Sequence, residues 1–210
     1  MNRLSLDRRT QIIAALVEGN SIRSTERMTG VHRDTIMRLL VEVGTGCAAI
    51  MDEKMRELPC HRVQVDEIWS YVGKKQRHVK PEDDKNRVGD QWTFVAIDAD
   101  TKLVPAYRVG KRTWTDAGIF MKDLSSRLAN RVQLSTDGLA AYADAVERAF
   151  GADVDYGQAV KFYEAEPVGP GRYSPPKVVD MERTVIAGSP DEGHISTSII
   201  ERQNLTMRMS

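Results

Sequence analysis

The chain has 210 residues, of which 41% are hydrophobic and 29% are charged. These fractions are typical of a globular protein with one substantial core, and they exclude intrinsically disordered and collagen-like chains. Lys and Arg together number 30, and so do Asp and Glu. The resulting net charge of zero argues neither for nor against binding to nucleic acid.

The sequence also limits the compartment and the use of cysteine. No apolar run approaches the roughly 20 residues of a membrane-spanning helix, and the first residues (MNRLSLDRRT) lack the apolar core of a signal peptide. We therefore expect a cytoplasmic protein. Cys47 and Cys60 do not form a CxxC pair, so we expect reduced thiols rather than zinc ligands.

Residues 1–45 carry the pattern of a helix-turn-helix domain. Asp7 is expected to cap a first helix that ends at Gly19, and Ser21 to cap a short second helix that ends at Gly30. A third helix is expected from about residue 32 to residue 40, with Ile36, Leu39 and Leu40 facing inward. The alternative is a three-helix structural cap with a solvated arginine face.

In a helix-turn-helix domain the third helix enters the major groove, so its exposed residues read bases and bind phosphates. Those residues are His32, Arg33, Asp34, Thr35, Met37 and Arg38. Glu26 departs from the usual pattern, because such motifs mostly carry a small residue just before the turn. Its carboxylate is expected to reach out of the helix junction or to loosen it.

The remainder of the chain divides into a connector and a larger domain. Residues 46–60 form the connector, with a short helix over MDEKMREL, and residues 61–210 form the domain. Strands are predicted over residues 63–72, 92–97, 103–109, 131–135, 159–163 and 178–186, and helices over residues 115–129, 139–150 and 196–209. This mixed α/β order favours an open sheet covered by helices.

Two charged or irregular segments interrupt this order. Residues 74–89 are densely charged and lack an apolar period, which predicts an exposed loop. Residues 169–176 (GPGRYSPP) are too rich in proline and glycine for regular structure. In the strand before the charged loop, Trp69 and Tyr71 are expected to pack rather than to stack on bases.

Three acids stand out by their positions. Asp66 lies inside an apolar strand beside Glu67, where an ionised carboxylate is costly unless a cation, a donor or a metal compensates it. Asp137 follows the strand over residues 131–135, and Glu201 lies in the final helix. Taken singly, Asp137 is typical of a strand-to-helix turn, and Glu201 of a solvated helix surface.

Three segments in order, VDEIWSYVGKK, STDGLAAY and SIIERQNLTMR, resemble the DDE transposases of the insertion sequence 1 type. The resemblance covers most of the chain and implies a catalytic domain with the ribonuclease-H-like fold. It implies that Asp66, Asp137 and Glu201 are the catalytic residues and hold two Mg²⁺ or Mn²⁺ ions, with Asp66 bridging both. Arg202 and Arg208 in the basic last stretch are then expected to contact DNA.

The resemblance also implies a function. A transposase of an insertion sequence binds double-stranded DNA at terminal inverted repeats, cleaves it with metal ions and joins the ends to target DNA, acting as a homo-oligomer on DNA. Glu67 is expected to be an accessory acid, although an exchange of roles with Asp66 stays open. Two rival functions are a transcriptional regulator without catalysis and a resolvase-type nuclease of the same fold.

The chain departs from that family at both ends. Family members often carry a cysteine-rich zinc element ahead of the helix-turn-helix, and this chain begins without one. They also continue for a few dozen residues beyond the glutamate helix, whereas this chain stops at Ser210. The resemblance therefore implies a chain that is truncated at its C-terminus.

Overall fold

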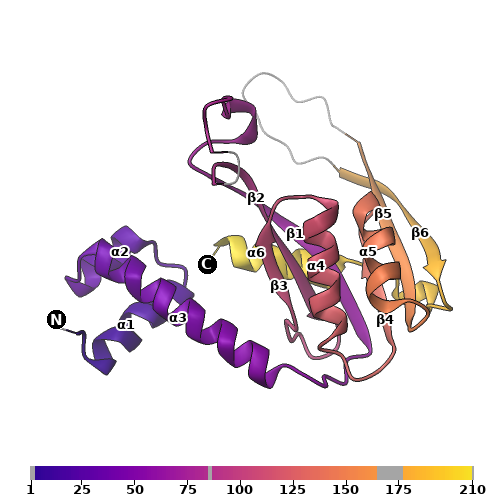
Figure 1. Cartoon of the computed structure of the whole chain (residues 1–210), viewed down its shortest axis with the longest axis horizontal. Coiled ribbons are helices and arrows are strands. Elements are labelled where there is room, and N and C mark those ends of the chain that lie inside the picture. The colour runs from indigo at the N-terminus through magenta and orange to yellow at the C-terminus, as the bar shows by residue number, and fades with distance from the viewer. Residues whose placement is uncertain (1–2, 85–86, 165–176, 210) are drawn as a thin grey trace. The chain divides into compact units, whose positions relative to one another are not determined.

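The computed structural model describes residues 3–84, 87–164 and 177–209, and it divides the chain into two compact units (Figure 1). One unit comprises Met1–Met55 with Gln203–Ser210, and the other comprises Arg56–Arg202. The expected loop over residues 169–176 lies outside the described residues. In the part of the chain that is described, every helix is too short or too polar to cross a lipid bilayer.

Three helices build the first unit: α1 (Leu6–Val17), α2 (Ile22–Thr29) and α3 (Arg33–Lys54). They pack around Ile12, Ile36 and Leu39. The Ser5 side chain caps α1 by accepting the N–H of Arg8, so the prediction of Asp7 as the cap was wrong by two residues. Ser21 caps α2 as predicted, and Gly30 ends it in the left-handed conformation (φ 68°) that glycine tolerates best.

The third helix is longer than the pattern predicts. It runs for 22 residues, through Gly44 and Gly46, and ends at Lys54 instead of stopping near residue 40. A glycine inside a helix costs only about 1 kcal/mol relative to alanine, and no proline interrupts this stretch. Leu40 is exposed rather than directed inward, so the apolar face of α3 is narrower than expected.

Glu26 neither leaves the helix junction nor loosens it. Its Oε1 accepts the backbone N–H of Arg33 at 2.9 Å, at the first residue of α3. The first N–H groups of a helix lack partners within the helix, and the positive end of the helix dipole favours a carboxylate there. The charged residue therefore caps the helix that follows the turn.

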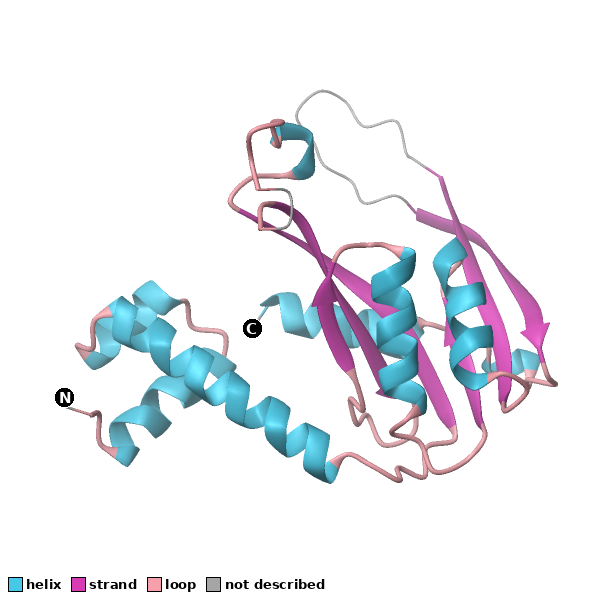
Figure 2. Ribbon diagram, in the orientation of Figure 1, coloured by secondary structure: helices cyan, strands magenta, loops and turns pink. Residues whose placement is uncertain are grey.

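The second unit contains a six-stranded mixed sheet (Figure 2). Its strands are β1 (Arg62–Val72), β2 (Gly89–Asp98), β3 (Tyr107–Gly110), β4 (Val132–Thr136), β5 (Val154–Glu164) and β6 (Lys177–Ala187). The order is β3-β2-β1-β4-β5-β6. β1, β2 and β3 form an antiparallel meander, β4 and β5 continue parallel to β1, and β6 closes the edge antiparallel to β5.

This strand order and these directions confirm the predicted α/β class and its ribonuclease-H-like sheet. β3 is shorter than predicted because Pro105, just before it, has no N–H to offer to a ladder. β5 begins five residues earlier than predicted, at Val154. Within the charged segment after β1, the structure describes a short 3₁₀ helix, η1 (Gln76–His78), and an ion pair between Lys74 and Asp83 at 2.9 Å.

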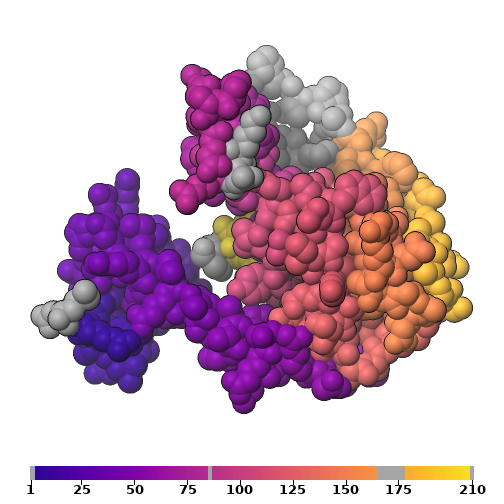
Figure 3. Space-filling model, in the orientation of Figure 1, coloured from indigo at the N-terminus to yellow at the C-terminus, as the bar shows by residue number. Residues whose placement is uncertain are grey.

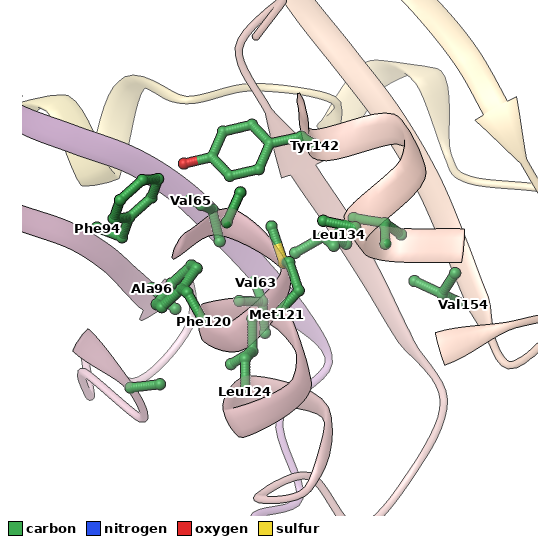
Figure 4. Close-up of a cluster of buried hydrophobic side chains, with 14 of the residues drawn as sticks. Val63, Val65, Phe94, Ala96, Phe120, Met121, Leu124, Leu134, Tyr142 and Val154 are labelled. Atoms are coloured by element: carbon green, nitrogen blue, oxygen red, sulfur yellow. The ribbon is translucent and has the colours of Figure 1, made fainter. Parts of the chain in front are cut away.

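Helices cover both faces of the sheet. α4 (Trp114–Ser125) and α5 (Ala140–Phe150) lie on one face, which is turned toward the viewer in the space-filling view (Figure 3). Between them and the sheet lies the main core, including Phe94, Phe120 and Tyr142 (Figure 4). On the other face Ile200, in the first turn of α6 (Ser198–Met209), packs against Val95 and Ile97.

Helix α4 yields a matched pair for a stability test. Phe120 is fully buried, whereas its neighbour Ile119 is 46% exposed. We expect Phe120→Ala to lower the free energy of unfolding by about 3 to 5 kcal/mol, because it leaves a cavity between α4 and the sheet. Ile119→Ala should cost less than about 1 kcal/mol in the same urea titration. Equal losses for the two variants would contradict this packing.

Candidate metal centre

The end of β4 determines where the candidate site lies. β1 pairs with β4 in parallel, and the last pair along the two strands joins Gln64 to Ser135. Asp66 and Asp137 each stand two residues beyond that pair, at the same level of the two strands. β1 continues from there with pairing to β2 alone. Beyond the end of β4, the edge of β1 is therefore open to side chains from both β1 and β4.

Three carboxylates converge at this edge. Asp66, Glu67 and Asp137 each offer an oxygen, and these oxygens lie within 4.8 Å of one another. Neighbouring residues of a strand point to opposite faces, so Asp66 and Glu67 would normally be separated by the sheet. They share one cluster because the edge of β1 is free at this point, and both side chains approach Asp137 around it.

Asp137 is held at the start of α5. Its Oδ1 accepts the backbone N–H of Leu139 at 3.0 Å, one residue before the helix begins. Gly138 between them permits the turn, because a Cβ at that position would lie 3.0 Å from the side chain of Val160. The carboxylate is therefore fixed near the positive end of a helix dipole.

A single arginine binds two of the three carboxylates. Nη2 of Arg112 lies 3.1 Å from Glu67 Oε2 and 3.5 Å from Asp137 Oδ2. The guanidinium also stacks on Trp92, with 4.8 Å between its central carbon and the ring centroid. Sequence reasoning did not single out Arg112, because nothing in its local pattern (GKRTW) distinguishes it from a solvated arginine.

Glu67 is the most deeply buried of the three acids, with 6% of its surface exposed. Burial raises the pKa of its carboxyl to about 7, and the negative charges of Asp137 and Asp66 add to the rise. The neighbouring Tyr142 hydroxyl and the Arg112 guanidinium lower that pKa without cancelling the effect of burial. Among the described residues, Glu67 Oε1 has no well-formed hydrogen bond.

The donor set fits a hard divalent cation. Mg²⁺ binds oxygens at about 2.1 Å, so two ligands on opposite sides of the ion stand about 4 Å apart. The three carboxylate oxygens lie within 4.8 Å of one another, and the buried Oε1 of Glu67 lacks a well-formed hydrogen bond that a cation could replace. Asp66, Glu67 and Asp137 could close on one ion with small side-chain movements.

In the described part of the chain, Glu201 does not belong to this cluster of carboxylates. Both of its oxygens bind Nζ of Lys161 on β5, and Oε1 also accepts the hydroxyl of Thr197 at 2.6 Å. Its helix is nevertheless fixed to the strand of Asp66. Gln64 Oε1 accepts the backbone N–H groups of Ile199 and Ile200 at 2.9 and 3.1 Å, at the start of α6.

The predicted DNA contacts lie in the first unit and in α6. His32, Arg33, Asp34, Met37 and Arg38 are exposed on α3, whereas Thr35 is partly buried and accepts a hydrogen bond from Arg38 at 3.4 Å. The remaining two, Arg202 and Arg208, are exposed on α6.

Comparisons with known proteins find similar solved structures. No protein-family model and no curated protein matches the chain. Among solved structures it is similar to a Mos1 transposase paired-end complex with the left transposon end (14% identity, TM-score 0.31) and to a Mos1 mariner paired-end complex with Mn (16% identity, TM-score 0.31). A pre-cleavage Mos1 transpososome is similar at 14% identity and a TM-score of 0.27.

Each match covers 74% of this chain. The chain spans about 60% of the length of those transposase chains.

The pKa of Glu67 leads to a test of the metal-free site. A carboxyl whose pKa is raised by folding binds its proton more tightly in the folded state, so stability falls as pH rises from about 4.5 to about 7. In EDTA, we expect this loss to reach about 3 kcal/mol and to disappear in Glu67→Gln, as measured by urea unfolding at pH 5 and pH 8. The matched control is Glu147→Gln on the exposed face of α5, which should keep the wild-type pH dependence. If Glu67→Gln also keeps the wild-type pH dependence, a raised pKa of Glu67 is not its cause.

Proposed function

We propose that this chain is a DNA transposase that cleaves and joins strands with divalent metal ions. The observation that carries the proposal is the convergence of Asp66, Glu67 and Asp137 at the open edge of a ribonuclease-H-like sheet. The three sequence segments that resemble transposases of the insertion sequence 1 type support that finer assignment. Two of those segments contain acids of the cluster, and the third contains Glu201.

The chemistry follows from the carboxylates. Asp66, Glu67 and Asp137 would hold a Mg²⁺ or Mn²⁺ ion, which would activate a water or a 3′-hydroxyl and stabilise the leaving oxygen. The activated oxygen attacks the scissile phosphorus and the bond to the 3′-oxygen breaks, which leaves a 3′-hydroxyl and a 5′-phosphate. In the joining step that 3′-hydroxyl attacks a phosphodiester of target DNA and displaces its 3′-oxygen.

Glu201 completes the proposed set as the ligand of a second ion. Its ion pair with Lys161 would then have to break, and Gln64 already fixes the start of its helix against β1, the strand that carries Asp66. Lys161 and Arg112 act as counter-ions before metal and DNA bind. Once released from the carboxylates, both cations are suited to bind phosphate oxygens of the DNA.

The first unit supplies the proposed binding to terminal inverted repeats. We assign residues 1–45 to this role, residues 46–60 to the connector and residues 61–210 to catalysis. The exposed His32, Arg33 and Arg38 on α3, with the partly buried Thr35, would contact the major groove, and Arg202 and Arg208 would contact phosphates. Since two transposon ends must be held together, the active form would be a homo-oligomer on DNA.

The cleavage test uses the full chain with a labelled duplex that carries the repeats flanking its gene. We expect nicking at the repeat boundary in Mg²⁺ or Mn²⁺, none in EDTA, and a loss of at least about 100-fold in Asp66→Asn and Asp137→Asn. Asp153→Asn, an exposed change near the start of β5, is the matched control and should cleave normally.

Two other outcomes of that experiment would favour rival functions. Binding to the repeats without nicking under any metal condition would indicate a transcriptional regulator. Nicking that ignores the repeat sequence and follows DNA shape would indicate a resolvase-type nuclease. Cleavage that survives both Asp66→Asn and Asp137→Asn would remove the proposed mechanism.

The proposed contacts of α3 with DNA are tested by the salt dependence of DNA affinity. Each phosphate contact releases counter-ions, so we expect Arg33→Ala and Arg38→Ala each to lower the slope of log affinity against log salt by about one. The measurement is fluorescence anisotropy with the repeat duplex at several salt concentrations. Arg148→Ala, an exposed arginine of α5, should leave the slope unchanged. An unchanged slope in the α3 variants would show that α3 is not the reader.

A further inference from the structure

A strip of rings and cations continues from the carboxylates along the hairpin formed by β1 and β2. It consists of Trp69, Tyr71 and Trp92, with Arg112 and Lys75 lying over the rings, and we call it the aromatic strip. We propose that the aromatic strip binds unpaired nucleotides of a DNA strand, with bases stacked on its rings and phosphates beside its cations. The three rings take no part in the carboxylate chemistry itself.

The strand register places the rings on one face. Glu67, Trp69 and Tyr71 alternate along β1, so all three point to the same side of the sheet. Trp69 stands directly opposite Trp92 on β2, which adds a third ring to this side. The rings of Trp69 and Tyr71 lie 5.8 Å apart and are tilted by 38°. Tyr71 remains 48% exposed, so packing inside the protein does not use up its surface.

Each end of the strip carries a cation. Nζ of Lys75 lies 5.5 Å from the centroid of the Trp69 ring and 5.9 Å from that of Tyr71. At the other end, Arg112 stacks on Trp92 and binds Glu67 and Asp137. The aromatic strip is therefore continuous with the candidate metal centre through a single arginine. A strand lying along it would have one of its phosphates beside the carboxylates.

The strip is held in place before any ligand arrives. Asp90 Oδ1 accepts the backbone N–H of Gln76 at 2.9 Å, which ties η1 to the start of β2. This N–H and the Trp69 indole hold the pKa of Asp90 below its usual range. A ring in ordered surroundings of this kind loses little conformational freedom when a base stacks on it.

The chemistry of the strip selects the ligand. A base in a duplex is covered on both faces by its neighbours, whereas an unpaired base offers a free face to a ring. Rings interleaved with cations match a strand that alternates bases and phosphates. A strand that is cleaved and joined must present unpaired nucleotides near the reacting phosphate, and in this respect the inference rests on the proposed function.

The test measures affinity for single-stranded DNA without metal. The probe is a fluorescein-labelled oligothymidylate of about 15 nucleotides, titrated with the full chain in EDTA and followed by anisotropy. We expect Tyr71→Ala to weaken binding about tenfold, because stacking on the ring is lost. Tyr71→Phe should bind like the wild type, and Lys75→Ala should lower the dependence of affinity on salt. Both residues are exposed, so these changes should not disturb folding.

Tyr107 is the matched control. It is 45% exposed on β3 and stands opposite Val95, whose side chain lies on the face covered by α6, so it points away from the aromatic strip. We expect Tyr107→Ala to bind oligothymidylate like the wild type. Equal affinities of Tyr71→Ala and Tyr107→Ala for oligothymidylate would overturn the inference and leave the strip to a protein partner.

A duplex of the same length is the second control. We expect Tyr71→Ala to bind this duplex like the wild type. If Tyr71→Ala loses as much affinity for the duplex as for oligothymidylate, the inference is overturned as well.

The inference and the proposed function fail separately. If nicking requires Asp66 and Asp137 but oligothymidylate binding ignores Tyr71, only the aromatic strip is refuted. If no metal supports nicking but Tyr71→Ala still loses single-strand affinity, the strip stands and the catalytic role falls. Oligothymidylate binding is measured in EDTA and nicking is measured with metal, so neither result depends on the other.

Discussion

The rest of this structure depends on one constraint: the negative charges of three carboxylates, gathered where the short strand β4 ends, must be balanced. β4 stops near Thr136 while β1 continues, and the open edge lets acids from opposite faces of β1 approach Asp137. Unpaired, such a group of charges would be costly outside water. The chain meets this cost with Arg112, with the start of α5 and with a raised pKa at Glu67.

The layers of the fold hold those compensating groups in place. α4 and α5 bury one face of the sheet and bring Tyr142 beside Glu67, while the first turn of α6 covers the other face and is fixed by Gln64. Two groups of carboxylates therefore lie against the same sheet, each with its own cation: Arg112 at Glu67 and Asp137, and Lys161 at Glu201. Under the proposed function, both cations would give way to metal ions.

Sequence reasoning predicted most elements because the period of apolar residues changes clearly from helices to strands after residue 61. It did not predict that α3 continues through Gly44 and Gly46, because glycine is typical of helix ends although it costs only about 1 kcal/mol inside a helix. It singled out Asp66, Asp137 and Glu201, but it did not predict that Glu67 joins the two aspartates in place of Glu201, because that depends on where β4 ends. Arg112 gave no signal, since its partners lie far away in the sequence.

The central claim is that Asp66, Glu67 and Asp137 bind a divalent cation. The most direct measurement is calorimetric titration of Mn²⁺ into the metal-free full chain at pH 8, beside Asp137→Asn and the exposed control Asp153→Asn. The account predicts saturable binding to the wild type and the control, and at least about tenfold weaker binding to Asp137→Asn. Equal affinities for Asp137→Asn and Asp153→Asn, or no saturable binding to the wild type, would contradict it.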